Sequence, residues 1–259
     1  MIMLLALDMG NTNITLGVFK NNELLFESRI ATDPAKMADQ YAVELLDIFR
    51  LYGVDANGFG GAILSSVVPP LDHTIQNAVR KAIGLMAMQV GPGTRTGMNI
   101  LIDNPATLGA DLLVGAVAAV KKYGAPCLIW DLGTATKVTV VDKNGAFRGG
   151  AIMPGISSSL DSLITKASLL PRIRLQAPEK VVGTNTNDCM ESGIVFGTAA
   201  MIEGMTARIE EELGYPVTVV GTGGLGRVVF VHCRRDIQMD DTLLLDGLRI
   251  IYEKNRKNT

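Results

Sequence analysis

The stretch Asp8–Asn22, DMGNTNITLGVFKNN, has a second copy in the same chain at Asp131–Gly145, DLGTATKVTVVDKNG. Each copy follows an apolar run, Met3–Leu7 or Cys127–Trp130, and begins with an aspartate and a glycine turn rich in Thr or Asn. A β-rich strand and then a turn come next, and the Asn144-Gly145 turn of the second copy is among the strongest short hairpin signals. The repeat predicts a duplicated lobe in which each half opens with a hairpin.

Outward from the repeat, the chain alternates between strands and helices. A helical spacing of apolar residues predicts helices over Met37–Leu51, Leu71–Ile83, Leu108–Lys122, Ser157–Ala167, Asp188–Leu213 and Asp241–Lys254. Buried strands are predicted at Gly61–Val68, which Pro69-Pro70 stops, and at Val217–Val220. Alternating strands and helices indicate an α/β protein, and the hairpins indicate mixed rather than purely parallel sheets. We therefore expect two lobes, at residues 1–122 and 123–259.

The composition narrows the class of protein. Of 259 residues, 47% are hydrophobic and 19% are charged, a balance typical of a cytosolic α/β enzyme. The formal net charge of -2 argues against a nucleic-acid partner, because binding to a phosphate backbone needs clustered Lys and Arg. The cysteines, Cys127, Cys189 and Cys233, have neither CxxC nor zinc spacing and predict reduced thiols.

No targeting or membrane segment is expected. The N-terminal apolar run ends at Asp8 and has no basic flank, which predicts a buried strand rather than a signal peptide. No apolar run approaches the ~20 residues that span a bilayer. We expect a cytoplasmic protein with no membrane partner.

The first Asp-Gly turn carries groups that bind nucleotide phosphates. Gly10 lets the backbone turn sharply, so that amide N–H groups are free to cradle phosphate oxygens. Asn11, Thr12 and Asn13 add uncharged donors, and Asp8 at the strand end can orient a hydrated magnesium ion.

The second copy repeats this set of groups with Asp131, Gly133, Thr134 and Thr136. A third glycine loop, Gly221–Gly224, follows a strand and fits the adenosine side of a nucleotide. Each loop alone has the alternative interpretation of an ordinary tight turn. The duplication and the third loop favour nucleotide binding, and we expect the two hairpins to face each other across a cleft and hold a triphosphate between them.

Two other nucleotide-binding classes do not fit. The P-loop pattern GxxxxGK[ST] is absent. The dinucleotide fingerprint requires a helix after its glycine turn, and the turn at Gly10 leads into a strand instead.

A series of motifs, taken in order, resembles a known family. The chain reads DMGNTN at the N-terminus, SSVVP at 65–69, GAD at 109–111, DLGTAT at 131–136, GGAIMPG at 149–155, GTNTNDCMESG at 183–193 and GTGG at 221–224. Together these motifs resemble the type III pantothenate kinases over essentially the whole chain. The resemblance implies a two-lobed actin-like (ribonuclease H-like) ATPase fold. It also implies ATP-dependent phosphorylation of pantothenate, the first step of coenzyme A synthesis, by a homodimer that needs Mg²⁺ and a monovalent cation, K⁺ or NH₄⁺.

The resemblance also assigns roles to residues of this chain. The segment Asp8, Met9, Gly10, Asn11, Thr12, Asn13, Ile14 and Thr15 would hold the ATP phosphates, with Thr134 as a further phosphate contact and Gly223 in the third loop. Asp111 would be the general base, since a carboxylate near a primary hydroxyl can accept its proton. Asp131 would bind the monovalent cation. Gly109, Ala110, Leu112 and Thr186 would line the substrate site. The alternative interpretation of Asp111 is an N-cap or first-turn acid that the helix dipole favours.

Three positions depart from the family pattern. The family motif Gly-x-Asp-Arg ends here in Leu112, which removes an arginine that grips the substrate carboxylate. Ile102 replaces a usual tyrosine of the same pocket, and Lys137 replaces a small hydroxyl residue. The Lys137 ammonium can sit where a potassium ion would lie, or contact a phosphate; the alternative is a solvent-facing strand residue.

Three functions therefore stay open. The first is a pantothenate kinase in which another cation, Arg95, Arg148 or Arg172, replaces the missing arginine. The second is a kinase for a less charged small alcohol. The third is a nucleotide-binding paralogue with little catalysis and a regulatory role.

Overall fold

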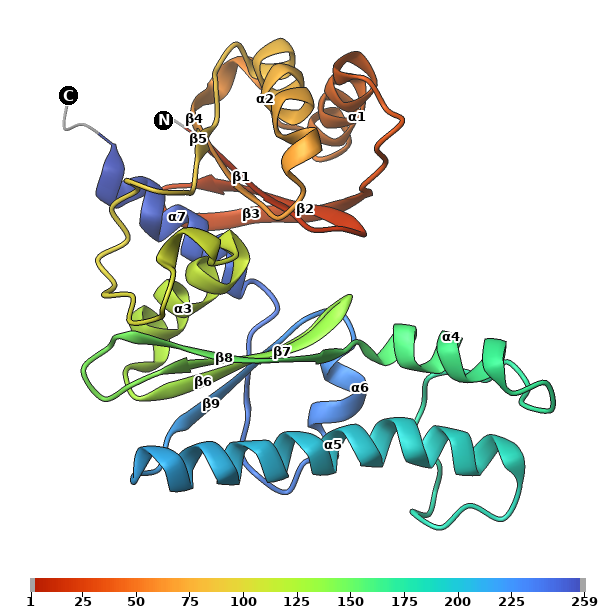
Figure 1. Ribbon diagram of the computed structural model, residues 1–259. Coiled ribbons are helices and arrows are strands. Elements are labelled where there is room, and N and C mark those ends of the chain that lie inside the picture. The colour runs from red at the N-terminus through yellow and green to blue at the C-terminus, as the bar shows by residue number, and fades with distance from the viewer. Residues whose placement is uncertain (1–2, 257–259) are drawn as a thin grey trace. The chain divides into compact units, whose positions relative to one another are not determined.

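The computed structural model describes residues 3–256 (Figure 1), and residues 1–2 and 257–259, the outer ends of the predicted lobes, lie outside the described residues. The chain divides into two compact units. The first contains the residues up to Gly97, Asn104–Ala118 and those from Leu243 on, and the second contains Met98–Asp103 and Ala119–Thr242. The units divide within helix α3 (Ala110–Tyr123), and the C-terminal helix belongs to the first unit, whereas we expected it in the second lobe.

The first unit is built on a mixed five-stranded sheet in the order β3-β2-β1-β4-β5. Its strands are β1 (Met3–Met9), β2 (Asn13–Lys20), β3 (Glu23–Ala31), β4 (Phe59–Ser66) and β5 (Met88–Gln89). Strands β1, β2 and β3 pair antiparallel, and β4 joins β1 in parallel. Asn21 and Asn22 connect β2 to β3 with φ angles of 51° and 69°, the positive values that a tight hairpin turn requires. The predicted mixed sheet is confirmed.

Helices cover both faces of this sheet (Figure 1). They are α1 (Ala38–Leu51) and α2 (Pro69–Ile83) on one face and α7 (Leu243–Asn255) on the other. The unit also contains the first part of α3 and the short 3-10 helices η1 (Ala56–Gly58) and η2 (Pro105–Thr107). Helices α1 and α2 pack on the face that carries Leu5, Leu7 and Met9, and α7 packs against β1 and β4 from the other side. Pro69 and Pro70 begin α2, where their missing N–H groups need no helical partner, so the predicted start at Leu71 was two residues late.

The second unit repeats the plan. Its five-stranded sheet has the order β10-β9-β6-β7-β8, with β6 (Cys127–Leu132), β7 (Ala135–Val141), β8 (Phe147–Pro154), β9 (Thr218–Thr222) and β10 (Gln238–Met239). Strands β6, β7 and β8 pair antiparallel, and β9 joins β6 in parallel. The central strand β6 thus pairs in the same way as β1, with an antiparallel strand on one side and a parallel strand on the other. The sequence repeat therefore corresponds to a structural repeat.

The core of the second unit lies between its sheet and helix α5. The helices are α4 (Ile156–Lys166), α5 (Thr186–Leu213) and α6 (Gly226–Phe230), and α5 runs along one face of the sheet (Figure 1). Leu128, Trp130 and Leu132 of β6 pack in one cluster with Ile202 of α5. The fully buried Trp130 indole Nε1 donates a hydrogen bond to Thr206 Oγ1 at 3.1 Å. None of the helices within residues 3–256 combines the length and the hydropathy needed to cross a membrane.

The Trp130–Thr206 hydrogen bond yields a test of this core. Replacing Thr206 with Val keeps the shape but leaves the buried indole N–H without an acceptor, which should lower the free energy of unfolding by about 1–3 kcal/mol. Thr198→Val is the matched control, because the Thr198 hydroxyl donates to Ile194 O of its own helix. Urea unfolding should show a loss for Thr206→Val that clearly exceeds the loss for Thr198→Val; equal losses would contradict this role of Thr206.

Candidate functional site

The first predicted phosphate loop lies at the carboxyl end of β1, the central strand of its sheet. Gly10, Asn11 and Thr12 connect β1 to β2, and Gly10 N donates to Asn13 O at 3.0 Å. Thr32, which follows β3, fixes the turn: its Oγ1 donates to Gly10 O at 2.7 Å and its N donates to Thr12 O at 3.0 Å. The side chains of Asn11, Thr12 and Asn13 are exposed and accessible to a ligand. No sequence motif marks Thr32 as a site residue, because strand pairing is what brings it beside the loop.

Asp8 precedes this loop and lies between two hydroxyl side chains. In the sheet it is opposite Thr15 of β2 and Ser65 of β4. Ser65 is fully buried, and its Oγ has no hydrogen-bond partner among the described residues. Met9 and Ile14 point to the opposite face, where both are fully buried in the core. Neither side chain is therefore available to a ligand.

The second loop, Gly133 and Thr134, connects β6 to β7 and is one residue shorter than the first. Gly155 packs directly on it, and a Cβ atom at Gly155 would lie 2.0 Å from Thr134 O, so the last position of the GGAIMPG motif needs glycine. Ser158 Oγ donates to the same carbonyl at 3.4 Å. Thr134 exposes its side chain, whereas Thr136 is only 1% exposed and faces the interior.

Asp131 precedes the second loop and forms an ion pair with Lys137. The two residues are directly opposite in the antiparallel β6–β7 ladder. Lys137 Nζ lies 2.9 Å from Asp131 Oδ2, and the two side chains are only 18% and 19% exposed. The interpretation of Lys137 as a solvent-facing strand residue is therefore wrong.

The third glycine loop lies beside the second one, because β9 runs parallel to β6 and places Thr222 opposite Asp131. Gly223 has a φ angle of +97°, and a Cβ atom there would lie 2.5 Å from the backbone N of Leu132. Glycine is thus required both by the backbone conformation and by the close approach. Gly226 N closes the loop with a hydrogen bond to Gly223 O at 3.0 Å.

Asp111 lies in the first turn of α3. Its Oδ1 accepts a hydrogen bond from Leu112 N at 2.8 Å, and a Cβ atom at Gly109 would lie 2.6 Å from the same oxygen. This position is the one expected for an acid that stabilises the start of a helix. The role of Asp111 as a general base is a proposal. Gly109, Ala110, Asp111 and Leu112 are all partly exposed.

The remaining predicted residues lie in the second unit. Thr186 is the exposed first residue of α5, next to the N-cap Asn185, whose side chain accepts from Asp188 N. Ile102 belongs to a segment that pairs with β8, and its side chain would be 3.7 Å from a Cβ atom at Gly149. The first unit therefore holds the Asp8 loop together with Asp111, and the second unit holds Asp131, Thr134, Gly223 and Thr186.

Comparison with known proteins identifies the family. The model of the type III pantothenate kinase family matches residues 4–208. The type III pantothenate kinase of Myxococcus xanthus is 42% identical over 253 residues, which cover 98% of this chain and 99% of that relative. That of Moorella thermoacetica is 40% identical and covers 98% of this chain and 100% of the relative. The chain belongs to the type III pantothenate kinase family.

Solved structures extend the likeness to the fold. A Baf family protein from Campylobacter jejuni, described as a transcriptional activator, aligns with a TM-score of 0.62 at 17% identity, covering 97% of this chain and 98% of that one. A candidate N-acetylmannosamine kinase from Listeria monocytogenes aligns with a TM-score of 0.52 at 12% identity, covering 98% and 100%. At these identities only the fold is shared. Two mixed five-stranded sheets with flanking helices give this type III pantothenate kinase family member the actin-like fold that we predicted.

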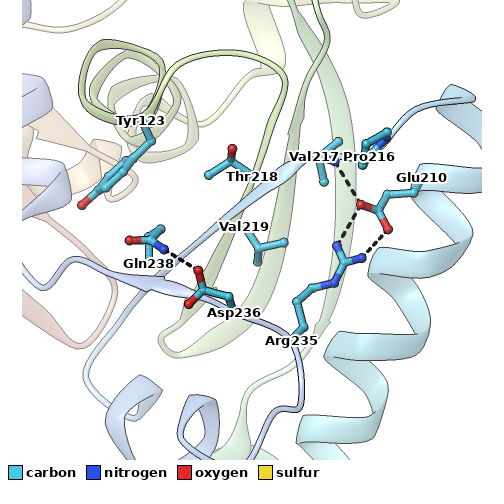
Figure 2. A pocket seen from close by; sticks show the side chains of 9 residues that line it. All are labelled: Tyr123, Glu210, Pro216, Val217, Thr218, Val219, Arg235, Asp236 and Gln238. Carbon is cyan, nitrogen blue, oxygen red and sulfur yellow. Dashed lines mark hydrogen bonds and ion pairs between the residues drawn. The ribbon is translucent and has the colours of Figure 1, made fainter.

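A pocket of about 600 Å³ lies in the second unit at the amino end of β9, away from the glycine loop that follows this strand (Figure 2). An ion pair forms one wall, with Arg235 Nη1 and Nη2 donating to the two carboxylate oxygens of Glu210 at 2.9 and 2.5 Å. The pocket is lined by Tyr123, Glu210, Pro216, Val217, Thr218, Val219, Arg235, Asp236 and Gln238. None of these is a predicted site residue.

The Glu210–Arg235 pair makes stability depend on pH. The hydrogen bond from Arg235, with help from the backbone N–H of Val217, lowers the pKa of Glu210 below its ordinary value of 4.5. A lowered pKa contributes stability that is complete above pH 4.5 and is lost as the pH falls through the folded-state pKa. Glu210→Gln should therefore lower the free energy of unfolding by about 1–2 kcal/mol at pH 7, and by less at pH 3.

Urea unfolding at pH 7 and pH 3 measures this effect. Glu211→Gln, on the exposed side of the same helix, is the control and should change stability by less than about 0.5 kcal/mol. A Glu210→Gln loss that stays the same at both pH values would rule out the ion pair as its cause.

Proposed function

We propose that this chain transfers the γ-phosphoryl group of ATP to the primary hydroxyl of pantothenate, which gives 4′-phosphopantothenate, the first step of coenzyme A synthesis. The observation that carries the proposal is the family match over nearly the whole chain, with the duplicated Asp-Gly hairpins in their predicted strands. The transfer forms a bond between the primary hydroxyl oxygen of pantothenate and the γ-phosphorus of ATP. It breaks the bond between the γ-phosphorus and the oxygen that bridges it to the β-phosphorus, so ADP leaves with that oxygen.

The phosphate contacts of ATP would come from the two hairpin loops. Backbone N–H groups and the exposed side chains of Asn11, Thr12 and Asn13 offer uncharged donors in the first loop, and Thr134 does so in the second. The turns are held by Thr32 and by Gly155. Loops that are fixed before ATP binds lose little conformational freedom on binding, which favours affinity.

Magnesium fits the oxygen groups around Asp8. This carboxylate has the hydroxyl residues Thr15 and Ser65 opposite it on the neighbouring strands, and carboxylate and hydroxyl groups offer the hard oxygen atoms that Mg²⁺ prefers. Mg²⁺ keeps several waters and takes one or two carboxylates together with substrate phosphates. Asp8 would hold the ion through water, and the bound ion would neutralise charge on the phosphates.

A free monovalent cation does not fit Asp131. The family resemblance assigns the Asp131 carboxylate to a monovalent cation, but this carboxylate already contacts the Lys137 ammonium at 2.9 Å. No step proposed for this chain uses such an ion.

Asp111 would act as the general base. Its carboxylate would accept the hydroxyl proton of pantothenate as that oxygen attacks the γ-phosphorus in line. Its partial exposure in the first turn of α3 makes the carboxylate accessible to a substrate.

The substrate end of the site would be less polar than in the family pattern. Gly109, Ala110, Leu112 and Thr186 are the proposed contacts, and Leu112 cannot form the forked pair with a carboxylate that arginine forms. Among the candidate replacements, Arg148 is half-exposed and lies 3.5 Å from Asp142. The loss of this arginine favours one second candidate function, phosphorylation of a less charged alcohol.

We also propose a cytoplasmic homodimer. The segment between α4 and α5 exposes Leu169, Val181 and Val182 at 92%, 66% and 78%, and exposed apolar side chains of this size favour a partner surface.

The three cysteines are free thiols, and burial raises the pKa of Cys127 to about 12, which keeps it protonated and unreactive. Reduced thiols fit a reducing compartment.

Coupled ADP release tests the function and the role of Asp111. Purified protein with Mg²⁺ and ATP should release ADP when pantothenate is added. Asp111→Asn should lower kcat by about 10²–10⁴-fold while ATP affinity stays the same, because only proton transfer is lost. Asp39→Asn is the matched control, since Asp39 is an acidic residue in the first turn of α1.

The outcomes separate the candidate functions. If Asp111→Asn and Asp39→Asn lowered kcat equally and only slightly, Asp111 would be an acid at the start of a helix and not the general base. ADP release only with pantetheine-like or sugar alcohols would show that the acceptor is another alcohol and not pantothenate. ATP binding without any ADP release would favour a regulatory paralogue.

Leu112→Arg tests the missing carboxylate contact. The guanidinium should restore a forked pair with the pantothenate carboxylate and lower the KM for pantothenate by about tenfold or more. Leu112→Lys supplies only a point charge and should have a smaller effect. Steady-state kinetics for the two variants measure this difference, and an unchanged KM in Leu112→Arg would show that this position does not meet the carboxylate.

A further inference from the structure

The Asp131–Lys137 pair is built into the second hairpin by its register. Residues directly opposite in an antiparallel ladder project from the same face, so the two side chains meet without bending either strand. The separation of 2.9 Å between Nζ and Oδ2 is that of a charge-assisted hydrogen bond. Because both side chains are about four-fifths buried, water screens this contact only partly.

The first hairpin shows that such a lysine is not needed to fold the turn. There Asp8 is opposite Thr15, the same ladder position that Lys137 occupies opposite Asp131. The two sheets have the same strand order and the same pairing around this position. The hairpins thus differ by a hydroxyl in one and an ammonium in the other, which points to a role for the charge itself.

An ammonium at this position excludes a second cation. One carboxylate oxygen of Asp131 is already in contact with Nζ, and a metal ion beside it would be repelled by the like charge. Among residues 3–256, no group of three or more His, Cys, Asp or Glu side chains is placed to hold a metal ion. Asp131 has therefore no acidic cluster that would outweigh this repulsion.

We propose that Lys137 is a tethered monovalent cation. Its ammonium neutralises Asp131 beside the second loop, so ATP binding and phosphoryl transfer in this chain do not need free K⁺ or NH₄⁺. The inference about phosphoryl transfer rests on the function proposed above, whereas the inference about ATP binding is tested separately.

The binding test compares salts. The Kd of Mg-ATP is measured by calorimetry in KCl, NaCl and choline chloride at equal ionic strength. The wild-type Kd should be the same in all three. Lys137→Thr installs the residue of the first hairpin and Lys137→Ser a smaller hydroxyl, and both variants should bind ATP about 5- to 100-fold more tightly in KCl than in choline chloride, the usual range of coupling between two ligands.

Lys143→Ser is the matched control, because Lys143 is an exposed lysine at the far end of the same hairpin. It should behave like the wild type in every salt. Circular dichroism and thermal unfolding identify any variant that does not fold, and using two substitutions keeps one available. The proposal would be overturned if the wild type bound ATP tightly only in KCl. It would also be overturned if the folded Lys137 variants had the same Kd for ATP in all three salts.

Turnover gives a second measurement. The wild-type kcat with pantothenate should not differ between KCl and NaCl, whereas the Lys137 variants should depend on K⁺. Absence of turnover with pantothenate, together with the predicted salt pattern of ATP binding, would remove the proposed substrate and keep the tethered cation. Pantothenate turnover that strictly requires K⁺ in the wild type would keep the proposed function and overturn the role of Lys137.

Discussion

The structure depends on one constraint that applies twice: a buried central strand must end in a polar turn. Strands β1 and β6 are almost entirely apolar until their aspartates, Asp8 and Asp131, and each has an antiparallel neighbour on one side and a parallel neighbour on the other. Polar backbone groups are costly to bury without partners, so the loop after such a strand is the place where they can face a ligand. The glycines at these turns allow the close packing that keeps the loops in place.

Much of the fold follows from local sequence signals. Apolar periodicity located α1, α2, α4 and α5 to within a few residues, and the Asp-Gly repeat located the two hairpins. The short strands β5 and β10, of two residues each, have too few residues for any pattern. The assignment of α7 to the first unit was also not predictable, because an amphipathic helix has an apolar face but does not specify the sheet that covers it.

The candidate site was predictable where its residues belong to the loops, and not where strand pairing supplies them. Thr32 contacts the first loop only because β3 pairs with β2, and no motif marks it. Met9 and Ile14 were placed in the site by motif, yet alternation along the strands turns both side chains into the core. Lys137 shows the opposite case: its substitution was visible in the sequence, and the strand register explains why its charge lies on Asp131.

The proposed function depends most on the proposal that the hairpin loops hold the phosphates of ATP. The most direct measurement is the calorimetric Kd of Mg-ATP for two single substitutions, Asn11→Ala in the first loop and Thr134→Ala in the second, both at exposed side chains. The account predicts that each substitution weakens ATP binding by about tenfold, as expected for a lost hydrogen bond to a charged group. A Kd that stays unchanged when either loop is altered would contradict it.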